Sequence, residues 1–279
     1  MDSIREFLGR RVWIAFLFHQ LLIFGLAFGF LNLVRAISGR TIHGGRDAVG
    51  FVDGIGLVLL SAGVIAFTIF FYRFVKDDAD APPLGIEISV RRLVEFLIGL
   101  LIGSVFIIAP YLIGFLSGRM FVADRITMHF DNFQAFQILA VAFFLLLAQS
   151  LTEETANRAF PIRLWQHRSL AFRLLVPSVF FALLHLADEN LSSERLAILF
   201  VGGIIQSLAY LLTGNVWFTS GIHTGANAAA FSLTGLWHAG AVVALVGDAA
   251  YPNWLAVASM LVFIGGLFFV SRGKREMKE

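Results

Sequence analysis

The stretch QSLTEETANRAFP, residues 149–161, decides how this chain is built. It carries three charged side chains close together, Glu153, Glu154 and Arg158. They follow residues 136–151, a run that is otherwise apolar enough to lie in lipid. A charge at that depth costs roughly 3 kcal/mol or more unless it is paired or faces a protein-lined cavity. The stretch therefore indicates a membrane helix with a functional site at its polar end.

The spacing of these charges predicts different roles for the two glutamates. Glu154 and Arg158 are four residues apart with the acid first, the favourable order for an ion pair on one helical face. Glu153 is rotated from Glu154 by about 100° around the helix. We therefore expect Glu154 to hold Arg158 and Glu153 to be the carboxylate that is available for chemistry.

The composition is that of an integral membrane protein. The 279 residues are 58% hydrophobic and 14% charged, and the mean hydropathy is +0.81. We expect one all-α, polytopic membrane domain over residues 1–279. A net charge of +2, with basic residues scattered near helix ends, argues against nucleic acid as a partner. The absence of cysteine excludes disulfides, thiolate zinc sites and a cysteine nucleophile.

Eight apolar runs predict about eight transmembrane helices, and the charged stretch among them indicates an intramembrane cavity that would be the place of any catalytic chemistry. With an even number of spans, both termini lie on one side. If that side is the cytoplasm, 15 of the 21 Lys and Arg residues lie inside and 6 outside, as the positive-inside rule requires. Short loops favour a prokaryotic inner membrane. The predicted helices cover residues 12–34, 52–75, 93–117, 134–160, 171–187, 196–213, 216–234 and 252–271.

Two connecting segments have features of their own. Residues 76–92 contain acids, two prolines and a glycine, a composition that suits a structured turn or a short interfacial helix but is more often that of a solvated connector, which we expect here. Residues 237–251 include the apolar run 239–246, which is too short to span a membrane and is either re-entrant or a packed loop. Three glycine pairs have the spacing of close helix contacts, although 26 glycines make such spacings common: Gly25 and Gly29, Gly99 and Gly103, and Gly221 and Gly225.

Two further predicted helices carry polar side chains at membrane depth. Phe181 and His185 are four residues apart on one helix, and His223 and Asn227 are four apart on another. Counting 1.5 Å per residue places Glu153 about 15 Å, His185 about 22 Å and His223 about 12 Å into a core of about 30 Å. Singly, each histidine is more often an interhelical hydrogen bonder. Together they exceed what packing requires, and we expect one shared cavity for Glu153, His185, His223 and Asn227.

At these residues the chain resembles the CPBP family of intramembrane proteases, which includes the Rce1-type CAAX proteases and bacterial Abi proteins. The resemblance covers roughly residues 134–235, which would form the catalytic core. The family's motifs EExxxR, FxxxH and HxxxN are matched in order by Glu153, Glu154 and Arg158, by Phe181 and His185, and by His223 and Asn227.

The resemblance implies hydrolysis of a peptide bond in or near the membrane. Glu153 with His185 would activate a water molecule, and His223 with Asn227 would stabilise the oxyanion of the tetrahedral intermediate. Glu154, Arg158 and Phe181 would support the site. The expected partners are the lipid bilayer and a membrane-associated peptide or protein, either a prenylated CAAX-like substrate or a leader peptide. The family resemblance implies these residue roles and partners.

Alternatives remain at two points. We expect no cofactor, because the HExxH helix is absent and asparagine is a poor zinc ligand; the alternative is zinc held by Glu153, His185 and His223. The alternative function is that of a non-catalytic peptide-binding or bacteriocin-immunity membrane protein of the same fold. A proton-coupled transporter is disfavoured, because paired discontinuous helices and inverted repeats are not visible in the sequence.

Overall fold

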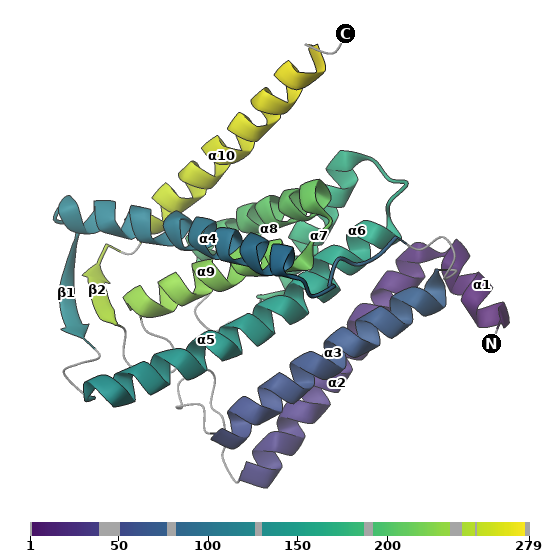
Figure 1. Ribbon diagram of the computed structural model, residues 1–279, viewed down its shortest axis with the longest axis horizontal. Coiled ribbons are helices and arrows are strands. Elements are labelled where there is room, and N and C mark those ends of the chain that lie inside the picture. The colour runs from purple at the N-terminus through teal and green to yellow at the C-terminus, as the bar shows by residue number, and fades with distance from the viewer. Residues whose placement is uncertain are drawn as a thin grey trace.

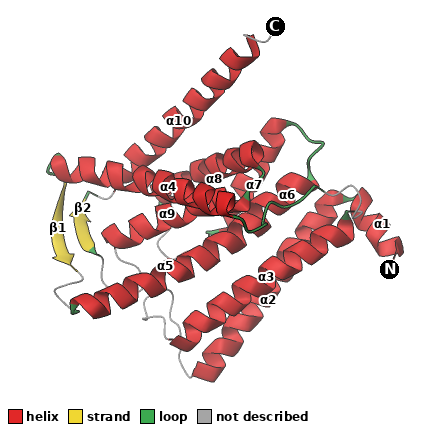
Figure 2. Ribbon diagram, viewed as in Figure 1, coloured by secondary structure: helices red, strands yellow, loops and turns green. Residues whose placement is uncertain are grey.

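The computed structural model describes residues 2–38, 51–76, 82–125, 130–186, 192–234, 242–248 and 250–276. Helices dominate these ranges, and two short strands lie at one end of the molecule (Figures 1 and 2). In chain order the elements are α1 (Asp2–Arg10), α2 (Val12–Ser38), α3 (Phe51–Val75), α4 (Val90–Leu116), β1 (Met120–Arg125), α5 (Asn132–Glu154), the π-helical turn η2 (Thr155–Ala159), α6 (Phe160–Leu164), α7 (Leu170–Leu184), α8 (Ser193–Thr213), α9 (Val216–Thr234), β2 (Val243–Gly247) and α10 (Ala250–Glu276).

The predicted all-α membrane architecture is confirmed, and each of the eight predicted helical ranges contains a helix. By length and composition, the described residues hold four helices that can each cross a membrane, or five if α1 and α2, bent by 109° at their junction, count as one span. Of the other predicted spans, α10 counts as a shorter apolar helix over Ala250–Gly265, and α7 and α9 fall short for physical reasons. With 15 residues, α7 is only about 22 Å long. Helix α9 is rich in Ser, Thr, His and Asn and packs between other helices, so it need not meet lipid.

Glycines bring α4 and α9 into backbone contact, as two of the predicted glycine pairs suggested (Figure 1). A Cβ atom at Gly103 would overlap the carbonyl oxygen of Ile222, and one at Gly225 would overlap that of Leu100. Only a residue without a Cβ permits this approach. The same close approach occurs at Gly99 and Gly221. Helix α9, which carries His223 and Asn227, is thereby fixed against α4.

The connection between α3 and α4 is an extended strap in its described part, residues 82–89. The expected solvated connector is wrong for this part, because its carbonyl groups bond to other elements, and the short interfacial helix does not form there either. The Val216 N–H donates to Gly85, whose φ of +77° needs a glycine. Side chains of Tyr72, Tyr210 and Trp217 donate to the carbonyls of Pro82, Leu84 and Ile86. Residues 77–81 lie outside the described ranges.

Strands β1 and β2 form a small antiparallel sheet, with Met120 paired to Gly247 and Arg125 to Val243. Part of the apolar run 239–246 is therefore a strand, which corrects the prediction of a re-entrant segment or packed loop; residues 235–241 lie outside the described ranges. Arg119 and Asp248, 3.3 Å apart, form an ion pair beside the sheet. The sheet joins the end of α4 to the start of α10.

The main buried core lies where α2 and α3 meet α6 and α7. Aromatic rings dominate it: Phe16 lies 4.8 Å from Trp165, and the ring of His19 lies 4.1 Å from that of Phe160. His19 is fully buried and shares a 3.0 Å hydrogen bond with Thr68. This core anchors the short helix α6 and, with it, the end of the stretch that carries the glutamates.

Candidate active site

The π-helical turn that follows Glu154 has its origin in Pro161. The N–H of Phe160 donates to the carbonyl of Thr155, five residues back, instead of four as in an α-helix. Proline has no N–H group. An N–H at residue 161 would donate to the carbonyl of Ala156 in a π-helix, or to that of Asn157 in an α-helix. Both carbonyls therefore need other donors. A proline three residues after Arg158 thus widens the helix at the predicted site.

Side chains replace the missing donor. The carbonyl of Ala156 accepts a 3.2 Å hydrogen bond from Nε2 of Gln20 on α2. The carbonyl of Asn157 accepts a 3.0 Å hydrogen bond from Nη1 of Arg158. Buried backbone oxygens rarely stay unpaired, because an unsatisfied one costs about 1–3 kcal/mol. The widened turn therefore depends on these two side chains.

Arg158 makes different contacts from those predicted. Its guanidinium is fully buried, donates from Nη2 to Gln206 at 3.3 Å, and lies 4.2 Å from the centre of the Phe181 ring. Within the described residues no ion pair joins it to Glu154, so the predicted ion pair between Glu154 and Arg158 is wrong. The reason is the π turn, which removes the α-helical alignment of residues four apart. Arg158 instead ties η2 to α7 and α8.

Glu154 is fully buried, and its partner is His223 on α9. Nδ1 of His223 lies 3.0 Å from Oε1 of Glu154. An ionised carboxylate only accepts hydrogen bonds, so an ionised Glu154 makes Nδ1 of His223 the donor. Glu154 thus fixes both the orientation and the tautomer of His223.

Glu153 faces the other side of the same imidazole. Its side chain is 20% exposed, and Oε2 lies 3.6 Å from Nε2 of His223. Oε1 accepts a 2.9 Å hydrogen bond from Gln149, one helical turn earlier. The two neighbouring carboxylates therefore enclose one histidine: Glu154 from the protein interior, and Glu153 from the accessible side.

Glu153 opens into a cavity of about 620 Å³ that it shares with His185. His185 ends α7, and its Nδ1 lies 2.8 Å from the carbonyl of Phe181, to which it donates. Side chains of α2 and α3 form the apolar wall, among them Ile23, Phe24, Leu57, Leu60 and Val64. The cavity thus combines one partly exposed carboxylate, one imidazole and a hydrophobic wall.

His223 and Asn227 line a second cavity, of about 410 Å³, between α4, α8 and α9. The four residues predicted to share one cavity are therefore divided into the pairs Glu153 with His185 and His223 with Asn227. Phe181 borders both cavities, and its ring lies 4.8 Å from that of His185 and 5.8 Å from that of His223. The aromatic ring fills the space in which we expected the four side chains to meet.

The described residues contain no group of three His, Asp or Glu side chains arranged to hold a metal ion. The zinc alternative named Glu153, His185 and His223. His185 points its Nδ1 to a backbone carbonyl, and His223 points its Nδ1 to Glu154. Zinc binding by this trio would require the side chains to move together.

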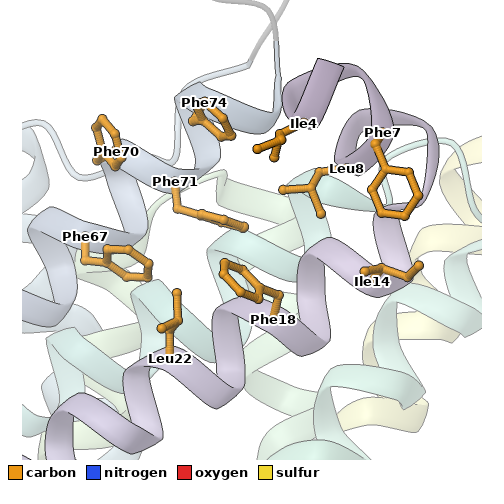
Figure 3. A pocket seen from close by; sticks show the side chains of 10 residues that line it. All are labelled: Ile4, Phe7, Leu8, Ile14, Phe18, Leu22, Phe67, Phe70, Phe71 and Phe74. Carbon is orange, nitrogen blue, oxygen red and sulfur yellow. The ribbon is translucent and has the colours of Figure 1, made fainter. Parts of the chain in front are cut away.

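A third pocket has a different character. It measures about 740 Å³ and lies between α1, α2 and α3, where rings and aliphatic chains turn toward one another (Figure 3). Its lining residues are Ile4, Phe7, Leu8, Ile14, Phe18, Leu22, Phe67, Phe70, Phe71 and Phe74. These side chains offer no acid, base or hydrogen-bond donor, so they cannot supply hydrolytic chemistry.

Sequence reasoning did not predict three glutamines at the site. Gln149 stands four residues before Glu153, and that spacing could have indicated the contact. Gln206 on α8 and Gln20 on α2 reach the site only through tertiary packing, for which the sequence holds no periodic signal.

The comparison with protein families matches this part of the chain. Residues 135–229 match the family described as type II CAAX prenyl endopeptidase Rce1-like. Searches of curated proteins and of solved structures give no significant match. The matched residues run from α5 through α9 and include Glu153, His185 and His223, so the resemblance seen in the three motifs is confirmed: the part of this membrane protein that holds the candidate site is Rce1-like.

Proposed function

We propose that this protein is an intramembrane endopeptidase in which Glu153 activates water to hydrolyse a peptide bond. The observation that carries the proposal is the position of Glu153: a partly exposed carboxylate beside a cavity, next to an imidazole that a second, buried carboxylate orients. The match to CAAX endopeptidases supports the same reaction. A positioned carboxylate of this kind is the typical general base of a hydrolase without a covalent intermediate.

In the proposed reaction, Glu153 takes a proton from a water molecule that His185 helps to hold. The water oxygen attacks the carbonyl carbon of the scissile bond, and the carbonyl oxygen becomes an oxyanion. The proton then passes to the leaving nitrogen, the C–N bond breaks, and the products are a carboxylic acid and an amine. Glu153 ends each cycle in its starting state, so the reaction consumes only water.

Asn227 and His223 are the proposed donors to the oxyanion. The amide of Asn227 can donate directly. His223 already donates from Nδ1 to Glu154, so it can donate from Nε2 only when the ring carries a second proton. Glu153, 3.6 Å from that nitrogen, can deliver the proton that it takes from water, and His223 would then pass the same proton to the leaving nitrogen as the C–N bond breaks. This step requires the substrate carbonyl to reach the side of His223 that borders the second cavity.

The proposed substrate is a membrane-associated peptide with apolar residues next to the scissile bond. The apolar wall that α2 and α3 contribute suits such residues. The description of the matching family makes a peptide with a prenylated cysteine, two aliphatic residues and a variable C-terminal residue the first probe to use. A bacterial leader peptide is the second. We propose that the reaction needs no metal ion.

The test is cleavage of a quenched fluorescent peptide of each kind by the purified full-length protein in detergent. Glu153→Ala and Glu153→Gln should lower kcat by about 10²- to 10⁴-fold, the usual contribution of a general base. Glu194→Gln, at the exposed start of α8, is the matched control and should cleave normally. Full activity of Glu153→Ala would refute the mechanism. Binding of the peptides by a wild-type protein that never cleaves them would favour the non-catalytic alternative.

A further inference from the structure

Gln20 on α2 reaches the candidate active site from outside the segment that matches the family. Its side chain is 5% exposed, and its Nε2 donates to the carbonyl of Ala156 in the π turn. A carbonyl oxygen can only accept hydrogen bonds, so the nitrogen of the amide must face Ala156. The orientation of the amide group is therefore fixed, and Oε1 must point the other way.

The side chain of Gln20 lines the Glu153 cavity together with Glu153 and His185. Within the described ranges, Oε1 of Gln20 is buried and has no hydrogen-bond partner. A buried acceptor without a partner calls for an explanation, because such atoms are uncommon and costly in folded proteins. Here the side chain that carries the atom borders a cavity large enough for a segment of peptide, and a small rotation of that side chain would expose the oxygen to it.

We propose that Gln20 binds the substrate, with Oε1 accepting a hydrogen bond from a backbone N–H of the peptide. The proposal rests on the proposed peptidase function. An extended peptide brings an N–H group at every residue except proline, and each must find an acceptor when it leaves water. The wall that α2 and α3 contribute is otherwise apolar except for Ser61, so the amide oxygen of Gln20 is one of two side-chain acceptors on this wall. The other end of the same amide supports the π turn that directly follows the two glutamates.

This arrangement makes Gln20 a link between substrate binding and the position of Glu153. Nε2 closes the π turn, whereas Oε1 would contact the peptide backbone. A residue with only a structural role would not distinguish one amide of the substrate from another. A residue that accepts a hydrogen bond from one substrate N–H makes binding depend on that one amide. The dependence of binding on individual substrate amides therefore provides the test.

The experiment is a backbone ester scan of the peptide that the wild-type protein cleaves. Each amide other than the scissile one, located by mass spectrometry, is replaced in turn by an ester, which removes one N–H. Binding of the labelled probes is measured by fluorescence anisotropy on the full-length Glu153→Gln protein, which holds them uncleaved. One ester should weaken binding about five- to tenfold, as expected for the loss of one hydrogen bond. A flat profile over all positions would overturn the proposal.

Gln20→Met in the same Glu153→Gln protein should bind every probe weakly and lose its preference for the amide over the ester at that position. Gln166→Met is the matched control: Gln166 bonds to His167 on a turn away from both cavities, and its variant should keep the preference. If Gln20→Met does not fold, Gln20→Glu replaces it, because its carboxyl group retains an oxygen acceptor and should retain the ester effect. If the same ester still weakens binding to Gln20→Met, the substrate N–H at that position binds another acceptor, and the proposal is wrong. Failure of the peptidase function is a separate result, seen as absence of cleavage by the wild type.

Discussion

His223 and Glu154 are joined by a buried 3.0 Å hydrogen bond although they are 69 positions apart in the chain. The bond connects the last residue of α5 with the middle of α9, and these helices carry the glutamates of the first motif and the whole of the third. It also leaves Nε2 of the imidazole facing Glu153. The two glutamates of one dipeptide thus act on opposite nitrogens of one ring, and substitutions at the two positions should have different effects.

We expect Glu154→Gln to lower kcat by roughly 10- to 150-fold, because a hydrogen bond to a charged group contributes about 1.5–3 kcal/mol. The amide can still accept from Nδ1, so the fold should survive while the imidazole loses its charged partner. The measurement is kcat and KM with the cleaved probe, next to thermal unfolding of the same sample. A variant with normal kcat would show that Glu154 does not orient His223 during the reaction.

Pro161→Ala should lower the activity without lowering the stability of the fold. The substitution restores an N–H that the carbonyl of Asn157 or Ala156 can bind, so the π turn can return to an α-helix and shift Glu153. We expect kcat to fall at least tenfold, since a misplacement of about 1 Å can cost roughly 100-fold, while the unfolding temperature stays the same or rises. Pro252→Ala, in the first turn of α10, serves as the control because proline removes no needed donor there. Equal activity of the two variants would contradict this account of the π turn.

The glycine contact between α4 and α9 should tolerate no added methyl group. Gly225→Ala places a Cβ against the backbone of Leu100, and overpacking of this kind costs about 1–3 kcal/mol or forces α9 away from α4. We expect a lower unfolding temperature and loss of cleavage, because α9 also carries His223. Gly25→Ala is the control: its added Cβ would have no neighbour within 4 Å among the described residues. If both variants unfold at the wild-type temperature, the contact is not as close as described here.

Chelation should leave the activity intact. After treatment with a chelator and elemental analysis of the protein, we expect the cleavage rate to stay within about twofold of the untreated rate, because the proposed mechanism uses only side chains and water. Loss of activity that stoichiometric zinc restores would instead support the alternative trio Glu153, His185 and His223. The readout must include the metal content of the active sample.

The sequence predicted the helices well because long apolar runs between charged or turn residues are a strong signal. It predicted the contact between α4 and α9 less securely. Gly99, Gly103, Gly221 and Gly225 form it, whereas Gly25 and Gly29, with the same spacing, have open space beside them. Spacing shows where a close approach is possible, but which helices actually meet depends on the packing of the whole chain.

The site was harder to predict because one residue changes the geometry of its neighbours. Counting four residues from Glu154 to Arg158 assumes an α-helix, and Pro161 widens the turn so that this assumption fails. The distribution of the histidines over two cavities depends on the ring of Phe181, whose place between them is set by tertiary packing. The chemical types at the site were readable from the motifs; their partners were not.

The backbone contact between α4 and α9 also limits where a peptide dissolved in the bilayer can enter the site. Helices that touch through their backbones have no layer of side chains that can rearrange, so α4 and α9, which border the cavity of His223 and Asn227, cannot part without losing their whole interface. Helices α2 and α3 meet the Glu153 cavity through side chains, which can change rotamer. We therefore expect lateral access from the lipid to open beside α2 and α3, with the paired helices α4 and α9 as the stationary half of the gate.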